Sequence, residues 1–385
     1  MNSTENETVA VDGNEFQLPY YKEAQWLEIL RLTFQVFVAS IGVAGNVLVC
    51  LVITFQPQMH TVINYFIRNL AVADLGILLM SFPFAVVKEQ DPYHWPLGQY
   101  ICRYVFPLAD IFYGVSIWSI TLIAIDRYKA IVRAVPPKRG SAVFKSARWM
   151  VAGVWMLSFV IISLPLYFVM DFIDYQPRFD MVDCTPEWPN NEAGDEMRQI
   201  YMIGLTVFWY VLPLGIIYGT FRSISRKLRA STKFNKAIRE EYGEIDEQSS
   251  RKRLRERQNS KAKKLLIPVV VVFAFSMFPL NAFRLVVLYW KEVVQHKYLW
   301  VYYNVCVTLV VANSSANCFI YSVVSKEFRQ SFKSFFSCSL HGPSHSVTER
   351  TVRSPLSPGP LNTSPLNMSP LNGRDEFNSK GETVV

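Results

Sequence analysis

The sequence predicts an all-α membrane protein, a bundle of seven transmembrane helices followed by a short amphipathic eighth helix. Two observations carry this prediction. The 385 residues are 51% hydrophobic and only 18% charged, whereas soluble domains carry about 25% charged residues. The charges also gather between long apolar stretches, each close to the roughly 20 residues that a helix needs to cross a bilayer. These stretches lie near residues 30–55, 63–87, 101–125, 149–170, 201–221, 265–290 and 298–324.

Each stretch is expected to be a helix, because apolar residues cover all its faces and a lipid-exposed strand would leave backbone groups without hydrogen bonds. Residues 1–28 are polar and lack a signal peptide's apolar core, so the first span is expected to direct insertion. Lysine and arginine gather after the third and fifth spans, and such residues accumulate in cytoplasmic loops. We therefore expect a multi-pass plasma-membrane protein, surrounded by lipid, with an extracellular N-terminus. The net charge of +8 then belongs to cytoplasmic loops, and no nucleic-acid partner is expected.

The chain divides into four parts: an extracellular N-terminus, the seven-helix domain, an amphipathic helix and a disordered cytoplasmic tail, at residues 1–28, 29–325, 326–338 and 339–385. The first part is expected to be glycosylated at the sequons of Asn2 and Asn6. Basic and aromatic residues alternate after the seventh span, which is typical of an interfacial helix, and Cys338 at its end is a candidate for palmitoylation. The tail is rich in Ser, Pro and Asn and cannot bury a core.

The last four residues, ETVV, predict a further partner. PDZ domains capture a C-terminal carboxylate and read a Ser or Thr two residues before a small apolar end. Thr383 and Val385 meet both requirements, so a PDZ-domain protein is an expected partner.

Several spans contain polar side chains that lipid does not tolerate without partners. Asp74 lies well inside the second span, and intramembrane carboxylates are candidates for function. In the seventh span Asn313, Asn317 and Tyr321 fall within about 80° of one another at 100° per residue, which makes one polar face. Arg127 ends the third span, where it either acts in function or simply extends toward lipid headgroups.

Two cysteines, Cys102 and Cys184, fall at extracellular positions, whereas the other four lie within spans or on the cytoplasmic side. Cysteines in an oxidising compartment favour a disulfide, which would tie the top of the third span to the loop after the fourth. A chance pair of free cysteines is the alternative.

Motifs in every span together resemble the rhodopsin-like (class A) G-protein-coupled receptors. In chain order they are Gly45-Asn46, LAVAD at 70–74, Cys102, DRY at 126–128, Trp155, Pro213, FAFSMFP at 273–279 and NCFIY at 317–321. The resemblance covers roughly residues 28–338. WPLG at 95–98 is similar to the first extracellular loop of peptide-binding members, so the chain looks like a neuropeptide receptor.

The resemblance implies a receptor that binds an extracellular ligand, activates heterotrimeric G proteins and binds arrestin. Arg127 would meet the G protein, with Asp126 restraining it at rest and Tyr128 completing the motif. Tyr321 would move inward on activation, in the motif that begins at Asn317. No nucleophile, base and orienting group are arranged for covalent chemistry, so no enzyme activity is expected.

Five polar positions also match those that surround a sodium-binding, water-filled cavity in this family: Asp74, Ser116, Asn313, Ser314 and Asn317. A hard cation takes oxygen ligands, and a buried carboxylate needs a counter-charge. No cofactor is required, and a sodium ion is the expected allosteric modulator. The alternative is a polar network filled only with water.

Four positions depart from the family pattern. Met277 replaces a tryptophan in the sixth span, Cys318 a proline in the seventh, Phe221 a tyrosine in the fifth, and Asn259 an acid at the foot of the sixth. The last change removes an ion-pair partner of Arg127, so the resting state is expected to be less restrained.

A basic peptide is the expected ligand. Amine receptors carry an Asp seven residues after the third-span cysteine; that position is Ala109, and Asp110 would lie about 100° round the helix. An amine is thus disfavoured as the alternative. An opsin is excluded, because the seventh span has no lysine for retinal. The loop after the fourth span is acidic, and a negative rim concentrates cations, although a merely solvated loop has the same composition.

The candidate ligand pocket, by family position, comprises five residues: Asp110, Tyr113, Asn281, Arg284 and Tyr303. Arg284 does not suit a cation and is expected to hold an acidic or amide group of the ligand. A transporter or channel is the alternative from another class. Inverted repeats would favour it, and the sequence shows no internal symmetry.

Overall fold

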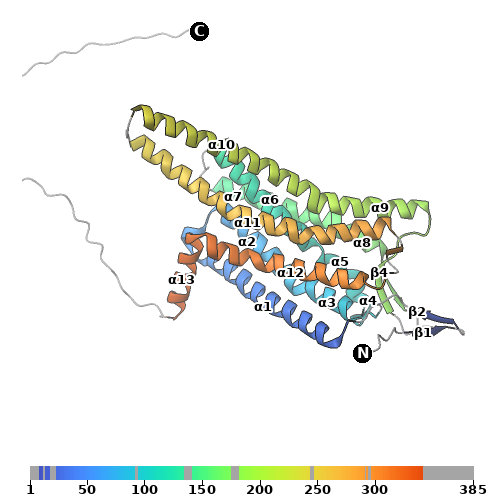
Figure 1. Cartoon of the computed structure of the whole chain (residues 1–385). Helices are drawn as coiled ribbons and strands as arrows, with labels where there is room; N and C mark the ends of the chain where they lie inside the picture. Colours follow the sequence, from blue (N-terminus) through green and yellow to red (C-terminus); the bar gives the residue numbers. More distant parts are fainter. Residues whose placement is uncertain are drawn as a thin grey trace, which may run out of the picture. The chain divides into compact units, whose positions relative to one another are not determined.

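The computed structural model describes residues 8–11, 14–17, 23–91, 94–133, 141–174, 182–242, 247–290, 292–293 and 296–340. Within these residues, seven helical spans are long and apolar enough to cross a membrane, as the sequence predicted. The spans are Gln25–Phe55, Val62–Gln90, Gly98–Ile131, Phe144–Val169, Glu192–Lys233, Ile267–Tyr289 and Leu299–Val324. They run side by side as one bundle (Figure 1).

Three spans contain no break in the helix. The first is α1 (Gln25–Phe55), the sixth belongs to α11 (Glu247–Tyr289), and the seventh is α12 (Leu299–Val324). Pro268 and Pro279 lie inside α11, which continues through both. A short 3-10 turn, Pro57–Met59, links the first span to the second.

The other four spans are composite, because a five-residue π-helical turn interrupts each one. The second joins α2 (Val62–Gly76) to α3 (Phe82–Gln90) through Ile77–Ser81; the third joins α4 (Gly98–Tyr100) to α5 (Phe106–Ala109) and α6 (Ile111–Ile131) through Ile101–Val105. The fourth joins α7 (Ser141–Ser158) to α8 (Leu164–Val169) through Phe159–Ser163; the fifth joins α9 (Glu192–Thr206) to α10 (Leu212–Tyr242) through Val207–Val211.

Proline explains where these π turns fall. Each one ends two residues before a proline, namely Pro83, Pro107, Pro165 and Pro213. A proline has no backbone N–H, and its ring clashes with the carbonyl four residues earlier. A wider π turn makes room for that ring within a continuous helix.

Hydroxyl groups from neighbouring spans donate to carbonyls near these turns. The bonds run from Ser81 to Ala109 (2.7 Å), from Ser163 to Pro107 (2.7 Å) and from Tyr201 to Ile162 (2.9 Å). A buried carbonyl without a partner is costly. The bonds therefore satisfy the disturbed backbone and also join the second, third, fourth and fifth spans to one another.

One end of the bundle carries an antiparallel hairpin of β3 (Met170–Asp174) and β4 (Val182–Pro186). Cys184 on β4 forms a disulfide with Cys102 in the third span, which confirms the predicted pairing. The backbone N–H of Trp95 donates to the Val182 carbonyl at 2.7 Å, so the loop of the WPLG motif is fixed to the same hairpin. A second hairpin pairs β1 (Thr8–Val11) with β2 (Asn14–Gln17).

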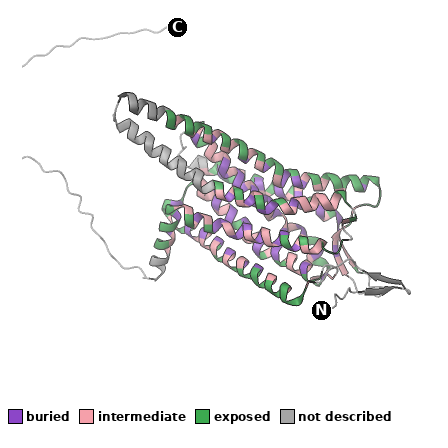
Figure 2. Cartoon of the chain, viewed as in Figure 1, coloured by how far each residue is buried: buried purple, intermediate pink, exposed green. Residues whose placement is uncertain are grey.

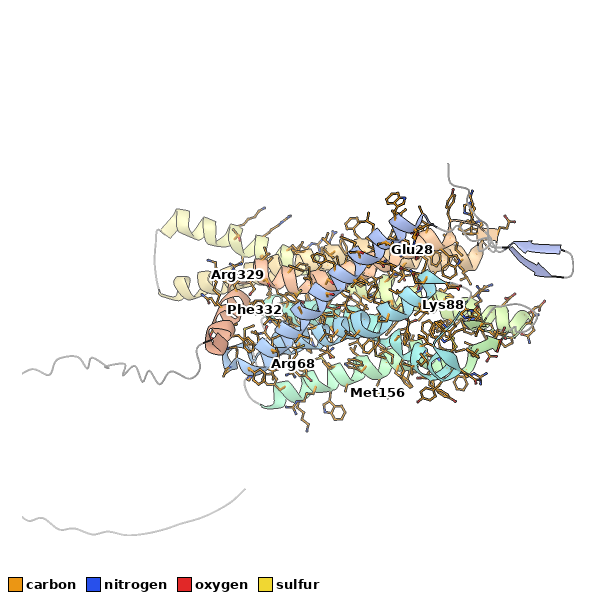
Figure 3. The ribbon with its side chains drawn as sticks, turned by 90° about the horizontal axis from the view of Figure 1, so that it is seen from below. Glu28, Arg68, Lys88, Met156, Arg329 and Phe332 are labelled. Atoms are coloured by element: carbon orange, nitrogen blue, oxygen red, sulfur yellow. A yellow bond between two sulfur atoms is a disulfide. The ribbon has the colours of Figure 1, made fainter. Side chains whose placement is uncertain are left out.

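The opposite end carries α13 (Lys326–Leu340), which begins directly after Ser325. Its Phe328 is buried and stacks on Tyr321 of α12, with ring centroids 5.5 Å apart. In Figure 3, Arg329 and Phe332 of this helix lie at one end of the bundle, and Glu28 and Lys88 lie toward the other.

Buried residues lie on the inside of the bundle, whereas many large apolar side chains are exposed on its outside (Figure 2). Phe37, Phe168 and Phe275 are each more than half exposed. Buried polar residues such as Asn46, Asp74 and Asn317 lie within the bundle instead. This inverted distribution is what a lipid solvent requires.

Candidate functional site

Asp74 is the central residue of a polar site inside the bundle. It is buried on α2, and both of its carboxylate oxygens have partners from other spans. Ser116 Oγ of α6 donates to one oxygen at 3.0 Å, and Asn317 Nδ2 of α12 donates to the other at 2.8 Å. An intramembrane carboxylate is costly without such partners. The structure thus joins the second, third and seventh spans through one acid.

The polar face of α12 turns toward this acid. Ser314 lies close enough to interact with Asp74, although its Oγ does not meet hydrogen-bond geometry. Asn313 is buried, and its Nδ2 has no hydrogen-bond partner. Asn46 of α1 donates to the Ser314 carbonyl at 3.1 Å. The site thus leaves Asn313 Nδ2 and Ser314 Oγ buried without a protein partner.

The donor set fits one kind of ion. It offers one carboxylate together with hydroxyl and amide oxygens, which are the ligands that a hard cation prefers. Among the residues that the structure describes, no three His, Cys, Asp or Glu side chains gather where they could hold a metal. A monovalent cation is therefore a better match than a divalent one.

Near the C-terminal end of α6, Asp126 and Arg127 form an ion pair of 2.8 Å. The Nε atom of Arg127 is buried and has no partner, so the pair leaves part of the guanidinium unsatisfied. The hydroxyl of Tyr321 is also buried without a partner. Tyr128 lies beside Arg133, whose guanidinium is 5.9 Å from its ring. The side chain of Asn259 lies outside the described residues, so its pairing stays a prediction.

Of the four residues that depart from the family pattern, the three with described side chains pack against the core. Met277 is buried in the core, and Phe221 packs against it at the edge. Cys318 donates from Sγ to the Ser315 carbonyl at 3.1 Å. A Cβ atom added to Gly45 of α1 would lie only 2.3 Å from that sulfur. With cysteine instead of proline, α12 stays unbroken and packs closely against α1.

The five candidate ligand residues come from three spans, the third, the sixth and the seventh, and they converge inside the bundle. Asp110 interacts electrostatically with Arg284 of α11, and both lie near Tyr113 and Tyr303. Asn281 and Arg284 line a small cavity of about 10 Å³, close to the space that one water molecule needs. The same cavity continues to Ser116 at the edge of the polar site.

Asp110 lies at the junction of α5 and α6 in the third span. Its backbone is helical, with φ −77° and ψ −17°, so its predicted offset of about 100° from Ala109 stays a prediction. Ala109 is buried, and its carbonyl accepts a hydrogen bond from Ser81. Asp110 therefore interacts with Arg284 from a position next to that of Ala109.

The two opposite charges in the pocket are not directly bonded. Arg284 Nη1 is buried and has no hydrogen-bond partner, and its guanidinium lies 4.4 Å from the centroid of the Trp209 ring. Among the described residues, no ion pair or hydrogen bond engages the Asp110 carboxylate. A guanidinium and a carboxylate are thus held near each other, each able to accept a ligand group. Sequence reasoning missed Trp209, which no spacing rule singled out.

Comparison with known proteins shows which family this chain belongs to. Residues 45–321 match the family described as 7 transmembrane receptor (rhodopsin family). The chain belongs to the rhodopsin family of seven-transmembrane receptors. It is 31% identical over 300 residues to neuropeptide Y receptor type 2 of Bos taurus, across 77% of this chain and 73% of that protein. It is 27% identical over 335 residues to the substance-K receptor of Rattus norvegicus, across 86% of this chain and 79% of that one.

The receptor is therefore a multi-pass membrane protein of the neuropeptide-receptor type, and it is not an enzyme. The neuropeptide Y receptor type 2 of Homo sapiens is likewise 31% identical over 300 residues, across 77% of this chain and 74% of that protein. Membership in the family also rules out the transporter alternative that the polar residues left open.

The receptor's acidic rim is partly neutralised by its own bases. Asp183 forms an ion pair of 2.5 Å with Lys88, and Asp171 pairs with Arg103. The hydrogen bonds from Arg103 and from the Phe172 N–H hold the pKa of Asp171 below its usual range. These two acids are engaged by receptor bases, a pairing that the sequence analysis did not identify.

A buried ionic network that the sequence analysis missed lies beside the pocket. Arg31 of α1 pairs with both Glu23 and Glu89, and the Glu89 side chain is fully buried. Gln35 Nε2 also donates to Glu89 at 3.2 Å and to Thr308 of α12 at 2.9 Å. The sequence signal for this network was an arginine inside the first apolar stretch and an acid at the end of the second. Their pairing ties the receptor's first, second and seventh spans together.

Proposed function

We propose that the receptor binds an extracellular peptide with a positively charged end and activates heterotrimeric G proteins in response. The observation that carries this is the pair of unbonded opposite charges, Asp110 and Arg284, in one pocket. Two of its relatives are named as receptors for neuropeptide Y and for substance K, which supports a peptide ligand.

The pocket would receive the ligand through both charges. Asp110 takes a cationic group, an ammonium or a guanidinium. Arg284 takes an oxygen anion or an amide oxygen, since its Nη1 is already desolvated and unsatisfied. The aromatic rings of Tyr113, Trp209 and Tyr303 surround both charges, and burial strengthens each contact.

Exposed acids outside the paired ones steer the ligand toward this pocket. Glu187, Glu192 and Glu196 lie exposed in and after the second extracellular loop. A negative rim raises the local concentration of a cation, and salt screens the effect beyond roughly 8–10 Å. Steering therefore rests on these acids more than on Asp183, which already pairs with Lys88.

Signalling is proposed to pass from the pocket to the DRY arginine. The cavity that reaches from Arg284 past Met277 to Ser116 connects the ligand residues with the acid of α2. At the other end, Arg127 and Tyr321 hold buried polar atoms without partners. Such atoms gain hydrogen bonds when the helices re-pack around a G protein or arrestin.

We also propose that a sodium ion binds beside Asp74. Asp74 would supply the charge, and Ser116, Asn313, Ser314 and Asn317 the polar surroundings. A bound sodium ion would neutralise the buried carboxylate. The chain's own residues hold the three spans in one arrangement, and that arrangement is the resting one.

The test is a screen of cells expressing the chain against a neuropeptide library and biogenic amines, with calcium and cyclic-AMP readouts. A peptide hit is expected. Asp110→Asn and Arg284→Gln should each lower the potency of that peptide by about 30-fold or more. Each substitution leaves one charged group of the bound ligand buried without a partner. Tyr289→Phe, which alters an exposed residue of the same helix as Arg284, is the matched control. Equal potency in all four receptors would refute the assigned pocket.

A small amine is the second candidate ligand, because Asp110 faces the pocket and could pair with an ammonium. An amine hit whose potency depends on Asp110 and not on Arg284 would favour it. A peptide needs both residues. The potency of the ligand on the Arg284→Gln receptor therefore distinguishes the two candidates.

A further inference from the structure

An open groove of about 780 Å³ lies between α10 and α11, away from every site described above. Its size falls within the range of small-molecule sites in proteins. Leu214, Tyr218 and Val271 form an apolar upper part, and three arginines of α10 line its lower part. None of the residues that line it is acidic.

The groove opens toward lipid and not toward the bundle interior. Tyr218, Arg222 and Arg229 fall within about 40° of one another at 100° per residue. Ile217 and Ile224 mark the buried face of the same helix, and they lie about 100° or more away. Tyr218 is 64% exposed and Val271 is 46% exposed, so both walls meet the surroundings of the bundle.

The three arginines stand where the apolar part of α10 ends. Arg222 follows Phe221 directly, and Arg226 and Arg229 lie about 6 Å and 10 Å further along the helix axis. All three are exposed, and none forms an ion pair with a residue that the structure describes. Arg222 Nη1 donates to the Tyr218 hydroxyl at 3.1 Å. Three positive charges therefore lie exposed where the apolar part of α10 ends, with no counter-charge among the described side chains.

We infer that this groove binds an anionic phospholipid whose headgroup carries several phosphates, a phosphoinositide of the cytoplasmic leaflet. Guanidinium groups bind phosphate through paired hydrogen bonds, and three of them match a multiply charged headgroup. The acyl chain would lie against Leu214, Tyr218 and Val271. A soluble phosphate compound would leave that apolar part uncovered, which is why a lipid is the occupant.

The charge test uses full-length receptor in phosphatidylcholine nanodiscs, with fluorescent phosphatidylinositol bisphosphate as the probe. Arg222→Gln/Arg226→Gln/Arg229→Gln should weaken probe binding by about 100-fold, since each lost guanidinium removes charge-assisted hydrogen bonds to a phosphate, about five-fold apiece. Lys129→Gln/Arg133→Gln/Lys227→Gln removes the same charge from exposed residues outside the groove. That control should change binding by less than about five-fold. Equal losses in the two variants would overturn the site in favour of general attraction to charge.

A second variant tests the lipid chain without changing charge. Val271→Trp fills the apolar part of the groove from an exposed position that does not disturb the core. It should weaken binding of the lipid probe, with an unchanged unfolding temperature to show that the fold is intact. Soluble inositol trisphosphate should displace the probe poorly from the unaltered receptor. Unchanged probe binding by Val271→Trp, or full displacement by the soluble headgroup, would overturn the proposal.

Discussion

Asp74→Asn removes the charge of the polar site and keeps its hydrogen bonds. Asn317 Nδ2 can still donate to the remaining side-chain oxygen, and the Ser116 hydroxyl can turn to accept from the new amide. Because both bonds persist and a buried charge disappears, the fold should lose less than about 1 kcal/mol of stability in sodium-free buffer. The substitution therefore isolates the ion from the structure around it.

Sodium should stabilise the unaltered receptor by mass action. At a concentration ten times its dissociation constant, a ligand that binds only the folded state contributes RT ln 11, or about 1.4 kcal/mol. The same factor, about eleven-fold, bounds the loss of agonist affinity if sodium binds only the resting state. Asp74→Asn should show neither effect, since the site then lacks its one carboxylate.

The assay is thermal unfolding of purified, unliganded receptor in sodium chloride and in N-methyl-D-glucamine chloride at equal ionic strength. Agonist competition in membranes under the same two salts gives the second readout. Thr121→Val is the matched control, because this buried hydroxyl of α6 donates to the Ile117 carbonyl of its own helix at 2.9 Å. A sodium effect that survives Asp74→Asn, or is missing from the unaltered receptor, would favour the water-filled network.

Glu89→Leu should destabilise the receptor by about 3 kcal/mol because it leaves Arg31 with a single carboxylate in a buried site. Adding Arg31→Met should recover most of that loss, and equal unfolding midpoints for the single and double variants would contradict the network. Asn259→Glu should lower ligand-free signalling at matched surface expression, since a glutamate can pair with Arg127; an unchanged baseline means that other contacts hold the resting state. Val385→Asp should abolish capture of PDZ-domain proteins in a pull-down, because a charged end does not fit their apolar pocket; equal capture by both chains excludes the motif.

The sequence was sufficient for the parts that lipid itself dictates. Long apolar stretches, polar residues within them and a cysteine pair outside them each have one physically acceptable arrangement, as the burial of Asp74 and the Cys102–Cys184 disulfide illustrate. Asp110 and Arg284, which were chosen by family position, interact electrostatically.

What the sequence could not give was the rotation and pairing of single side chains. A helical wheel assumes 3.6 residues per turn, and the π turn in the third span breaks that assumption above Asp110. Ion pairs such as Arg31 with Glu89 join residues 58 positions apart, so no local sequence pattern predicts them. The acidic composition of the loop likewise did not reveal the bases that pair with Asp171 and Asp183.

Each π turn gives its span a point at which a change of length can be absorbed. A π turn holds about one residue more than an α-helical turn. Deleting that residue would let the helix close into a regular α-helix with nearly the same rotation and rise, so the segments on both sides would keep their faces. In a helix without such a turn, the same deletion would rotate everything beyond it by about 100° and shift it by about 1.5 Å. Four of the seven spans could thus lose one residue at the π turn and still present the same side chains to the bundle.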